Sequence, residues 1–321
     1  MNAPILKRIG SAEELGRLRE RLQAERPAGS AASRQILVCF GGSCLASGAK
    51  EVRDALRLQL EMEKLSDQVA LVETGCMGPC VVGPVVLVGE DRTFYQGVKP
   101  DDAADIVKQH ICGGKRVELL LVRDASGKTP APCRSELEFF KRQTQIVLRN
   151  CGWINPERIG DAIARDGYAA LAKVLTESKP ETVVEEMKAS GLRGRGGAGF
   201  PTWLKWNLAR ESADSVRYVL CNADEGDPGA YMDRSVLEGD PHSVIEGMAI
   251  AAYAIGAQQG YVYVRAEYPL AVERLSTALA QARTCGLLGP KILGTAFSFD
   301  LEIRMGRSEE HTSELQSRSD L

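Results

Sequence analysis

The chain has 321 residues, of which 44% are hydrophobic and 26% are charged, and its formal net charge is −3. This composition predicts a folded globular protein of two or three domains and excludes a disordered one. The slightly negative charge excludes the basic surface typical of a nucleic-acid-binding protein. The longest apolar stretch, residues 248–257, is about half as long as a membrane-spanning helix needs to be.

The first ten residues lack the apolar core of a secretory signal peptide, so we expect a cytoplasmic protein in a reducing compartment. In such a compartment, the nine cysteines are expected to be ligands or buried thiols and not disulfides.

The N-terminal part of the chain predicts a small α/β module. Residues 11–23 carry leucines at helical spacing, and Ser11 with Glu14 three residues later is typical of a helix N-terminus. Residues 27–33 have the composition of a linker. The elements expected next are strand 35–40, helix 49–64, strands 68–73, 81–89 and 94–97, and helix 101–110.

A loosely structured connector, residues 113–149, is expected to lead into a second domain. The elements expected there are helices 156–178 and 181–190, a helix from Pro201, strand 216–221, helix 241–257, strand 260–265, helix 270–284 and strand 298–304. This alternation of strands and helices favours a mainly parallel sheet covered by helices.

The last fifteen residues, 307–321, have no helical or strand period. They resemble the translation of a sequencing-library adapter, so we interpret them as a non-native tail rather than a natural polar one. The expected organisation is an N-terminal helix and linker (1–34), an α/β module (35–112), a connector (113–154), a second α/β domain (155–306) and this tail (307–321).

Four cysteines follow two of the predicted strands. Cys39 and Cys44 are separated by four residues, and Cys76 and Cys80 by three. Glycines and a proline between and beside them allow tight turns that direct backbone amides inward. Four thiolates with nearby N–H donors are what an iron–sulfur cluster requires.

Other interpretations of this quartet remain open. Structural zinc also binds four cysteines, but usually with two-residue gaps. A thioredoxin-type dithiol requires Cys-x-x-Cys, which is absent. The pattern favours a two-iron cluster. The remaining cysteines, which have no paired spacing, are expected to be mostly small buried hydrophobes: Cys112, Cys133, Cys151, Cys221 and Cys285.

A glycine-rich loop, residues 191–201, precedes the helix expected from Pro201. Residues 194–199 match G-x-G-x-x-G but follow a helix and not a strand, so the match to a dinucleotide fingerprint is weak. Exposed amides at a helix N-terminus nevertheless favour a phosphate group. Lys205, one turn into the helix, can add a positive charge, and Phe200 can stack on a flat ring.

A polar segment, residues 222–229, follows the strand expected at 216–221. Asn222, Asp224 and Glu225 lie where open α/β sheets bind ligands, at the carboxyl end of a strand. The composition of the segment is also that of an ordinary turn. Its combination with the glycine loop favours a nucleotide site with phosphate at one end and a polar ring at the other.

Residues 190–206, 221–234, 238–257 and 260–267 resemble the NADH-oxidising flavoprotein subunit of respiratory complex I. They equally resemble the diaphorase subunits of soluble NAD-linked hydrogenases and formate dehydrogenases. The resemblance extends over about residues 150–306. Residues 35–112 resemble the thioredoxin-like two-iron ferredoxin domain, and the fusion favours the soluble enzymes. The resemblance implies an α/β protein, a thioredoxin-like [2Fe-2S] ferredoxin domain followed by an incomplete Rossmann-like FMN-binding domain.

The resemblance also implies a reaction and its residues. NADH gives a hydride to FMN, which passes single electrons to iron–sulfur clusters. Phe200 matches the aromatic residue that stacks on the nicotinamide cofactor, and Asp227 matches an acid near NADH. The metal ligands implied are Cys39, Cys44, Cys76 and Cys80, and the cofactor-binding residues are Gly194, Arg195, Gly196, Gly197, Phe200, Lys205, Asn222, Asp224, Glu225 and Asp227.

The implied partners are iron–sulfur and catalytic subunits of a hydrogenase, formate dehydrogenase or complex I. The location would be cytoplasmic, peripheral to the membrane through such partners. The family continues beyond Gly306 with a segment that completes the flavin pocket and with four cysteines for a [4Fe-4S] cluster. We therefore expect this C-terminally truncated sequence to bind FMN weakly or not at all, and its longer parent to bind it.

Trp203 stands where the family commonly has glycine, so a bulky indole is expected to alter the approach of NADH. Two other functions remain as alternatives: a non-catalytic assembly or cluster-carrier subunit of the same fold, and a thiol-redox or zinc module joined to an unrelated dehydrogenase.

Overall fold

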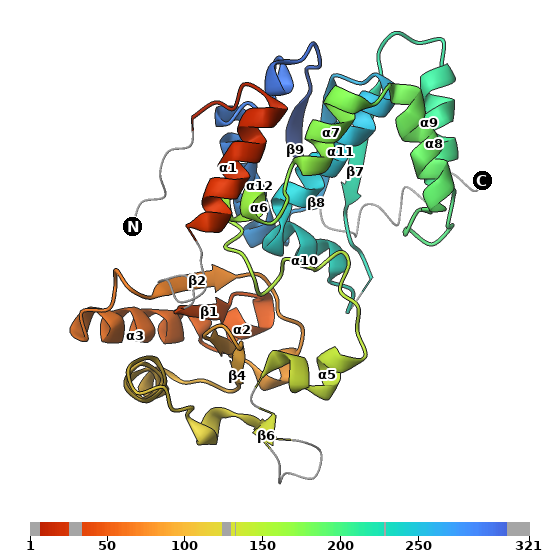
Figure 1. Ribbon diagram of the computed structural model, residues 1–321. Coiled ribbons are helices and arrows are strands. Elements are labelled where there is room, and N and C mark those ends of the chain that lie inside the picture. Colours follow the sequence, from red (N-terminus) through yellow and green to blue (C-terminus); the bar gives the residue numbers. More distant parts are fainter. Residues whose placement is uncertain (1–6, 26–33, 124–129, 132, 228, 307–321) are drawn as a thin grey trace. The chain divides into compact units, whose positions relative to one another are not determined.

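A computed structural model describes residues 7–25, 34–123, 130–131, 133–227 and 229–306. The linker predicted at 27–33 and the tail predicted at 307–321 lie outside the described residues. The chain divides into two compact units (Figure 1). The first unit consists of Met1–Arg19, Glu157–Leu237 and Pro241–Leu321, and the second of Glu20–Pro156 and Glu238–Asp240. The domain boundaries proposed from the sequence stay a prediction.

The second unit is built on a four-stranded mixed sheet, β2-β1-β3-β4. Its strands are β1 Gln35–Cys39, β2 Ala70–Thr74, β3 Val86–Val88 and β4 Thr93–Tyr95. β1 and β2 are parallel, with Gln35 opposite Ala70, and the other pairs are antiparallel. The central strand β1 is apolar and almost entirely buried, which agrees with a strand covered on both faces.

Helix α3 Ala49–Met62 packs on β1 and β2 of this sheet. Four further helical elements pack on α3: α2 Gly42–Ala46, η2 Pro100–Asp102, α4 Ala103–Asp105 and the π-helical η3 Ile106–Cys112. Because side chains four apart share one helix face, Val52, Leu56 and Leu60 of α3 are buried together. The sequence did not predict α2, and only part of the strand expected at 81–89 forms, because the turn η1 Cys80–Val82 occupies its beginning.

The segment expected to be a loosely structured connector contains short elements. They are η4 Glu118–Leu120, β5 Val122–Arg123, β6 Pro130–Ala131, η5 Arg134–Glu136 and α5 Glu138–Lys141. Leu120, Leu121 and Leu137 are buried in the core of the second unit. These buried leucines anchor the described parts of this stretch to the core of the second unit.

The first unit contains a three-stranded parallel sheet, β7-β8-β9. Its strands are β7 Tyr218–Ala223, β8 Gln259–Arg265 and β9 Asp300–Gly306. Tyr218 lies opposite Gln259, and Gln259 opposite Asp300. The parallel sheet predicted from the sequence is confirmed.

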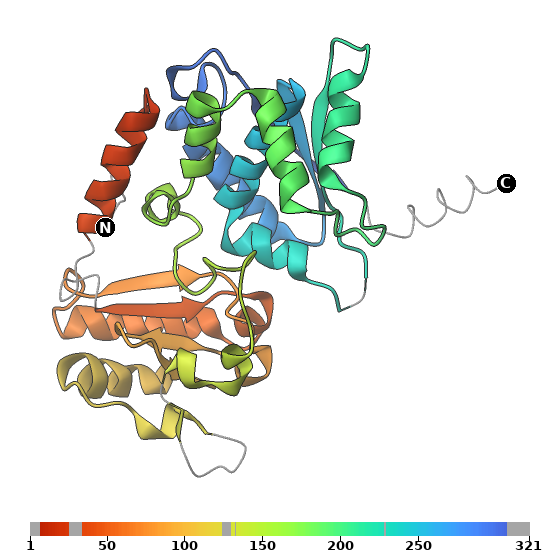
Figure 2. The ribbon, with the colours of Figure 1, turned by 45° about the vertical axis from the view of Figure 1, so that its right-hand side comes forward.

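Helices connect and flank these strands (Figure 2). They are α1 Ala12–Ala24, α6 Ile159–Ala164, α7 Ala169–Glu177, α8 Pro180–Ser190, α9 Thr202–Glu211, α10 Met232–Gly239, α11 Pro241–Ile255 and α12 Pro269–Thr284, with the turn η6 Ile292–Gly294. At the start of α1, Ser11 Oγ accepts a hydrogen bond from the Glu14 amide at 3.1 Å, as its sequence predicts. The helix expected over 156–178 is instead two helices, because Asp166 and Tyr168 between them adopt positive φ angles. The helix α10 was not predicted.

The sheet of the first unit has one covered and one exposed face. The largely buried helix α11 packs on β7 and β8, and α12 packs on β9. On the opposite face, 50% of Tyr218 and 71% of Leu220 are exposed. The prediction of a sheet covered by helices therefore holds for one face in the described part of the chain. Among the described residues, no helix is both long enough and apolar enough to span a bilayer.

Candidate functional site

The second unit brings the four predicted cysteine ligands together. Cys39, Cys44, Cys76 and Cys80 line one small cavity of about 10 Å³. The Cys39 thiol is within hydrogen-bonding contact of the sulfurs of Cys44 and Cys76. Cys76 in turn contacts Cys80. Two pairs of residues far apart in the sequence thus converge because β1 and β2 are parallel neighbours and each pair follows one of these strands.

Glycines allow the sulfurs to approach the backbone. A Cβ built on Gly83 would lie only 2.8 Å from Cys44 Sγ. A Cβ built on Gly41 would lie 3.0 Å from the Cβ of Cys76 and 3.2 Å from its Sγ. A larger residue at either position would displace a cysteine, so these glycines shape the thiol cavity.

Hydrogen bonds and burial shift the pKa values of the four thiols in different directions. Hydrogen bonds with Cys44 and Cys76 raise the pKa of Cys39 well above its usual value. The bond to Cys39 lowers the pKa of Cys44, to which the Val85 amide also donates. The bond to Cys39 likewise lowers the pKa of Cys76 to about 6, and the Gly78 amide donates to its sulfur. Burial raises the pKa of Cys80 to about 11.

Four convergent thiols with backbone N–H donors fit a [2Fe-2S] cluster, whose irons are held by four thiolates tuned by such bonds. In the ranges that the structure describes, no three His, Cys, Asp or Glu side chains form a group that could hold a single metal ion. A two-iron cluster instead distributes its four thiolates over two metal atoms.

The other cysteines differ in their surroundings. Cys151 and Cys285 are buried, as expected for small hydrophobic side chains. Cys133 and Cys221 are half-buried and Cys112 is exposed, so the expectation that most of the five are buried was wrong. Burial raises the pKa of Cys285 to about 11, and it does the same for Cys221. Such thiols are poor nucleophiles near neutral pH, because the thiolate is the reactive form.

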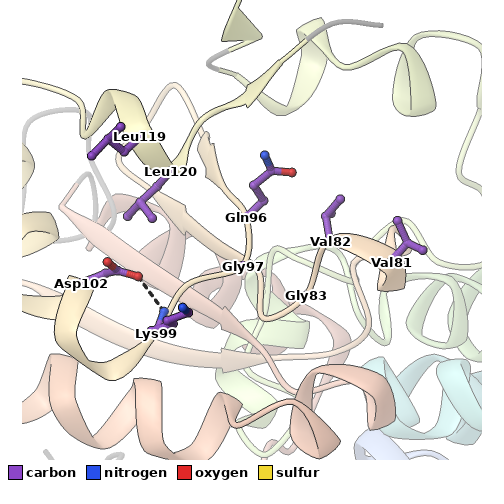
Figure 3. A pocket seen from close by; sticks show the side chains of 9 residues that line it. All are labelled: Val81, Val82, Gly83, Gln96, Gly97, Lys99, Asp102, Leu119 and Leu120. Atoms are coloured by element: carbon purple, nitrogen blue, oxygen red, sulfur yellow. Dashed lines mark hydrogen bonds between the residues drawn. The ribbon is translucent and has the colours of Figure 1, made fainter. Parts of the chain in front are cut away.

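A second hollow of the same unit adjoins the Cys76–Cys80 loop and has a volume of about 480 Å³. Leu119 and Leu120 lie on one side of it and Val81 and Val82 on the other (Figure 3). Below them, the backbone N–H of Lys99 donates to Asp102 Oδ2 at 2.7 Å. The lining residues follow no recognised motif, so the sequence does not predict this hollow.

In the first unit, the glycine-rich loop is a narrow turn between α8 and α9. The Gly194 amide donates to the Phe200 carbonyl at 2.8 Å, and Arg193 donates to the Gly199 carbonyl at 3.0 Å. Gly197 and Gly199 adopt positive φ angles, which favour glycine. Among the described residues, a Cβ built on Gly196 would meet no atom within 4 Å, so no packing contact in that part of the chain requires glycine there.

The side chains predicted to act beside this loop are accessible. Arg195 and Lys205 are exposed, and 42% of Phe200 is exposed. The indole of Trp203, by contrast, packs with Val183 and Val184, and Lys188 Nζ lies 4.7 Å from the centre of its ring. The predicted effect of Trp203 on the approach of NADH stays a prediction.

The acidic segment begins at the end of β7. Asn222 Oδ1 accepts a hydrogen bond from the Asp224 amide at 3.0 Å, which fixes the turn. Asp224 Oδ1 is buried and has no hydrogen-bond partner among the described residues. A Cβ built on Gly306, at the end of β9, would lie 3.1 Å from this oxygen. A buried carboxylate oxygen without a partner is costly, and a ligand hydroxyl or N–H group would satisfy it.

Glu225 already has partners within the chain. Its Oε1 accepts the amide of Asp233 at 3.1 Å, and its Oε2 accepts the hydroxyl of Tyr268 at 3.3 Å. The same Oε2 accepts the Arg234 amide at 3.4 Å, so the carboxylate caps the beginning of α10. Burial and the nearby Glu225 charge raise the pKa of Asp233.

Arg265 was not identified from the sequence. It donates to the backbone carbonyl of Glu225 and lies 3.5 Å from Glu267 and 5.5 Å from the ring of Tyr268. Arg265 ends β8, whose neighbour β7 ends at the acidic segment, and this position at a strand end could have identified it from the sequence. Asp227 is exposed, and its carbonyl accepts the Ala230 amide at 3.0 Å.

The two motifs lie at the same end of the first unit. Figures 1 and 2 both show the loop between α8 and α9 at the end where β7 terminates. The topology explains this: α9 starts at the glycine loop, residues 212–217 turn the chain, and β7 returns in the opposite direction. The exposed loop and the partnerless Asp224 oxygen therefore fit a phosphorylated polar ligand.

Comparisons with known proteins identify both units. Residues 25–110 match the family model of the thioredoxin-like [2Fe-2S] ferredoxin. Residues 187–309 match that of the Nuo51 FMN-binding domain. The predicted α/β fold, a thioredoxin-like [2Fe-2S] domain followed by an FMN-binding domain, is confirmed.

Several curated proteins are similar in sequence to this chain. The NADP-reducing hydrogenase subunit HndC of Solidesulfovibrio fructosivorans is 59% identical over 52% of this chain and 34% of its own length. A subunit of the NADH-quinone oxidoreductase of Rhizobium meliloti is 46% identical over 54% of this chain and 42% of its own length.

The NAD-reducing hydrogenase HoxS subunit alpha of Cupriavidus necator is 34% identical over 85% of this chain and 44% of its own length. The chain thus spans less than half the length of these curated relatives. Both domain types occur in one sequence here, and the chain is similar to hydrogenase and NADH-quinone oxidoreductase subunits over part of their length.

Proposed function

We propose that this chain is the electron-input part of an NADH:acceptor oxidoreductase. It would oxidise NADH by hydride transfer to FMN and pass single electrons to iron–sulfur clusters. The observation that carries this proposal is the partnerless Asp224 oxygen beside an exposed glycine loop, in a domain that matches an FMN-binding family.

FMN, when bound, supplies the conversion between a two-electron hydride and single electrons. The backbone of Gly194, Arg195, Gly196 and Gly197 would hold its phosphate, and Lys205 would add a positive charge. Asn222 and Asp224 would bind its polar groups through their oxygens. The role of Glu225 would be to hold this segment in place, since its carboxylate caps α10.

Two exposed side chains are suited to NADH. Phe200 offers an aromatic face at the end of the glycine loop. Asp227 provides a carboxylate that can accept hydrogen bonds from sugar hydroxyls. The reaction requires no general acid or base at carbon, because the hydride would move directly between the two cofactors.

Cys39, Cys44, Cys76 and Cys80 would hold the [2Fe-2S] cluster. Its partners would be iron–sulfur and catalytic subunits of a hydrogenase, a formate dehydrogenase or complex I, with a [4Fe-4S] cluster in the longer parent. Support for the first and last of these comes from relatives that are named as subunits of hydrogenases and of an NADH-quinone oxidoreductase. We place the assembly in the cytoplasm.

The test is an NADH–ferricyanide assay on a longer protein that carries this sequence and has the length of the relatives. Wild type should retain flavin and turn over. Asp224→Ala should lower FMN affinity by about tenfold or more. A hydrogen bond to a buried charged group contributes about 1.5–3 kcal/mol, and this contribution would be lost. Glu302→Gln, on an exposed side chain of β9, should match wild type.

A wild-type protein without flavin and without turnover would refute the enzyme proposal and leave the non-catalytic carrier. Equal FMN affinity in wild type and Asp224→Ala would refute the assignment of Asp224.

A further inference from the structure

Phe139, a residue of α5, covers the loop between Cys76 and Cys80 from outside. A Cβ built on Gly78 would lie 3.0 Å from Phe139 Cε1 and 3.3 Å from its Cζ. The phenyl ring therefore rests on the α-carbon of Gly78. Gly78 also lines the cavity into which the four thiols point, so one glycine separates this cavity from the ring.

The ring is held by a chain of contacts that reaches the core. Phe139 and Phe140 meet edge to face, with ring centres 5.0 Å apart. Phe140 packs against Phe94, which is fully buried, and under the guanidinium of Arg134 at 4.5 Å. Arg134 also donates to Gln145 Oε1 at 2.6 Å. These contacts fix the orientation of α5, although it is only one turn long.

The covered loop lies close to the protein surface. Val81, which follows Cys80 directly, is 97% exposed, and Cys76 and Cys80 are half-buried. Phe139 is 45% exposed, so its outer side meets water while its inner side lies on Gly78. The apolar shell around a metal site controls solvent access and the local dielectric, and thereby the reduction potential.

We propose that Phe139 is a positioning residue that shields the [2Fe-2S] cluster from water by capping the Cys76–Cys80 loop at Gly78. This inference rests on the cluster assignment of the proposed function and concerns a residue outside its ligand set. With the cap removed, water approaches the sulfur atoms of Cys76 and Cys80. The cluster is then lost faster, and its more negatively charged reduced form is better solvated.

The test uses the full chain with its cluster. The graded variants Phe139→Leu, Phe139→Val and Phe139→Ala are compared with Ile146→Ala, a truncation of a 70% exposed side chain in the same unit. The decay of the visible absorbance is followed in air with excess chelator, and the midpoint potential is measured by EPR. Far-UV circular dichroism verifies that each variant is folded.

We expect the loss rate to rise as the side chain shortens, at least threefold in Phe139→Ala, with Phe139→Leu and Ile146→Ala close to wild type. The midpoint potential should become more positive in Phe139→Ala, where 59 mV corresponds to a tenfold change in the reduction equilibrium.

Equal loss rates in Phe139→Ala and Ile146→Ala would overturn the proposal. So would faster loss at an unchanged potential, which would indicate weaker packing without a change in solvation. Absence of the two-iron spectrum in wild type would refute the cluster assignment itself, which is a different result.

Discussion

Two glycines of this chain show how the space around a single residue determines the effect of a substitution. The residue type and spacing of the four cysteines predict their role as ligands, but only their contacts explain the glycines beside them. A Cβ built on Gly83 would lie 2.8 Å from Cys44 Sγ, so there is no room for a methyl group at this position. By contrast, no atom of another described segment lies within 4 Å of a Cβ built on Gly16 in α1.

We therefore predict opposite effects of two glycine-to-alanine substitutions. Gly83→Ala should destabilise the second unit by about 1–3 kcal/mol through overpacking and should lower the iron content per chain. Gly16→Ala should stabilise by about 0.5–1 kcal/mol, because alanine favours a helix interior. Iron analysis and urea unfolding check both, and normal iron content in folded Gly83→Ala would contradict the predicted crowding of Cys44.

At the scale of elements, apolar periodicity predicted most helices and strands but missed those set by contacts distant in sequence. The break between α6 and α7 is an example. Glu246, from α11, accepts the amides of Tyr168 at 2.8 Å and Leu171 at 3.0 Å, and so caps α7 from another helix. A side chain so distant along the chain cannot be read as a cap from local sequence.

Replacing this cap should cost stability. In Glu246→Gln, the side-chain amide has one acceptor atom for two buried amides, so we expect a loss of about 1–3 kcal/mol in the free energy of unfolding. Glu302→Gln, which breaks an exposed ion pair with Arg304, should cost at most about 0.5 kcal/mol. Urea unfolding monitored by tryptophan fluorescence distinguishes the two, and equal losses would contradict the capping role.

The whole molecule consists of two compact units with separate chemistry: the proposed cluster ligands in one, and the glycine loop and Asp224 in the other. A cluster that binds only folded protein adds its binding free energy to the unit that holds it. The second unit should therefore depend on the cluster for stability, and the first should not.

Removal of the cluster tests this. Cys39→Ser should abolish the visible absorbance and lower one calorimetric transition by several degrees, while a second transition stays in place. Cys112→Ser, at an exposed thiol, should leave both transitions and the absorbance unchanged. Equal displacement of both transitions by Cys39→Ser would show that the two units unfold together.

The sequence alone determined the α/β class, the cysteine quartet and the two motifs of the proposed nucleotide site, because ligand chemistry and backbone turns require particular residue types at short spacing. Only the tertiary structure decided that Cys39 and Cys76 share one cavity, that Glu225 caps α10, that Asp224 has an unsatisfied buried oxygen and that Phe139 covers Gly78. The first and last of these are contacts between segments distant along the chain. They depend on strand order and packing, which local patterns do not encode.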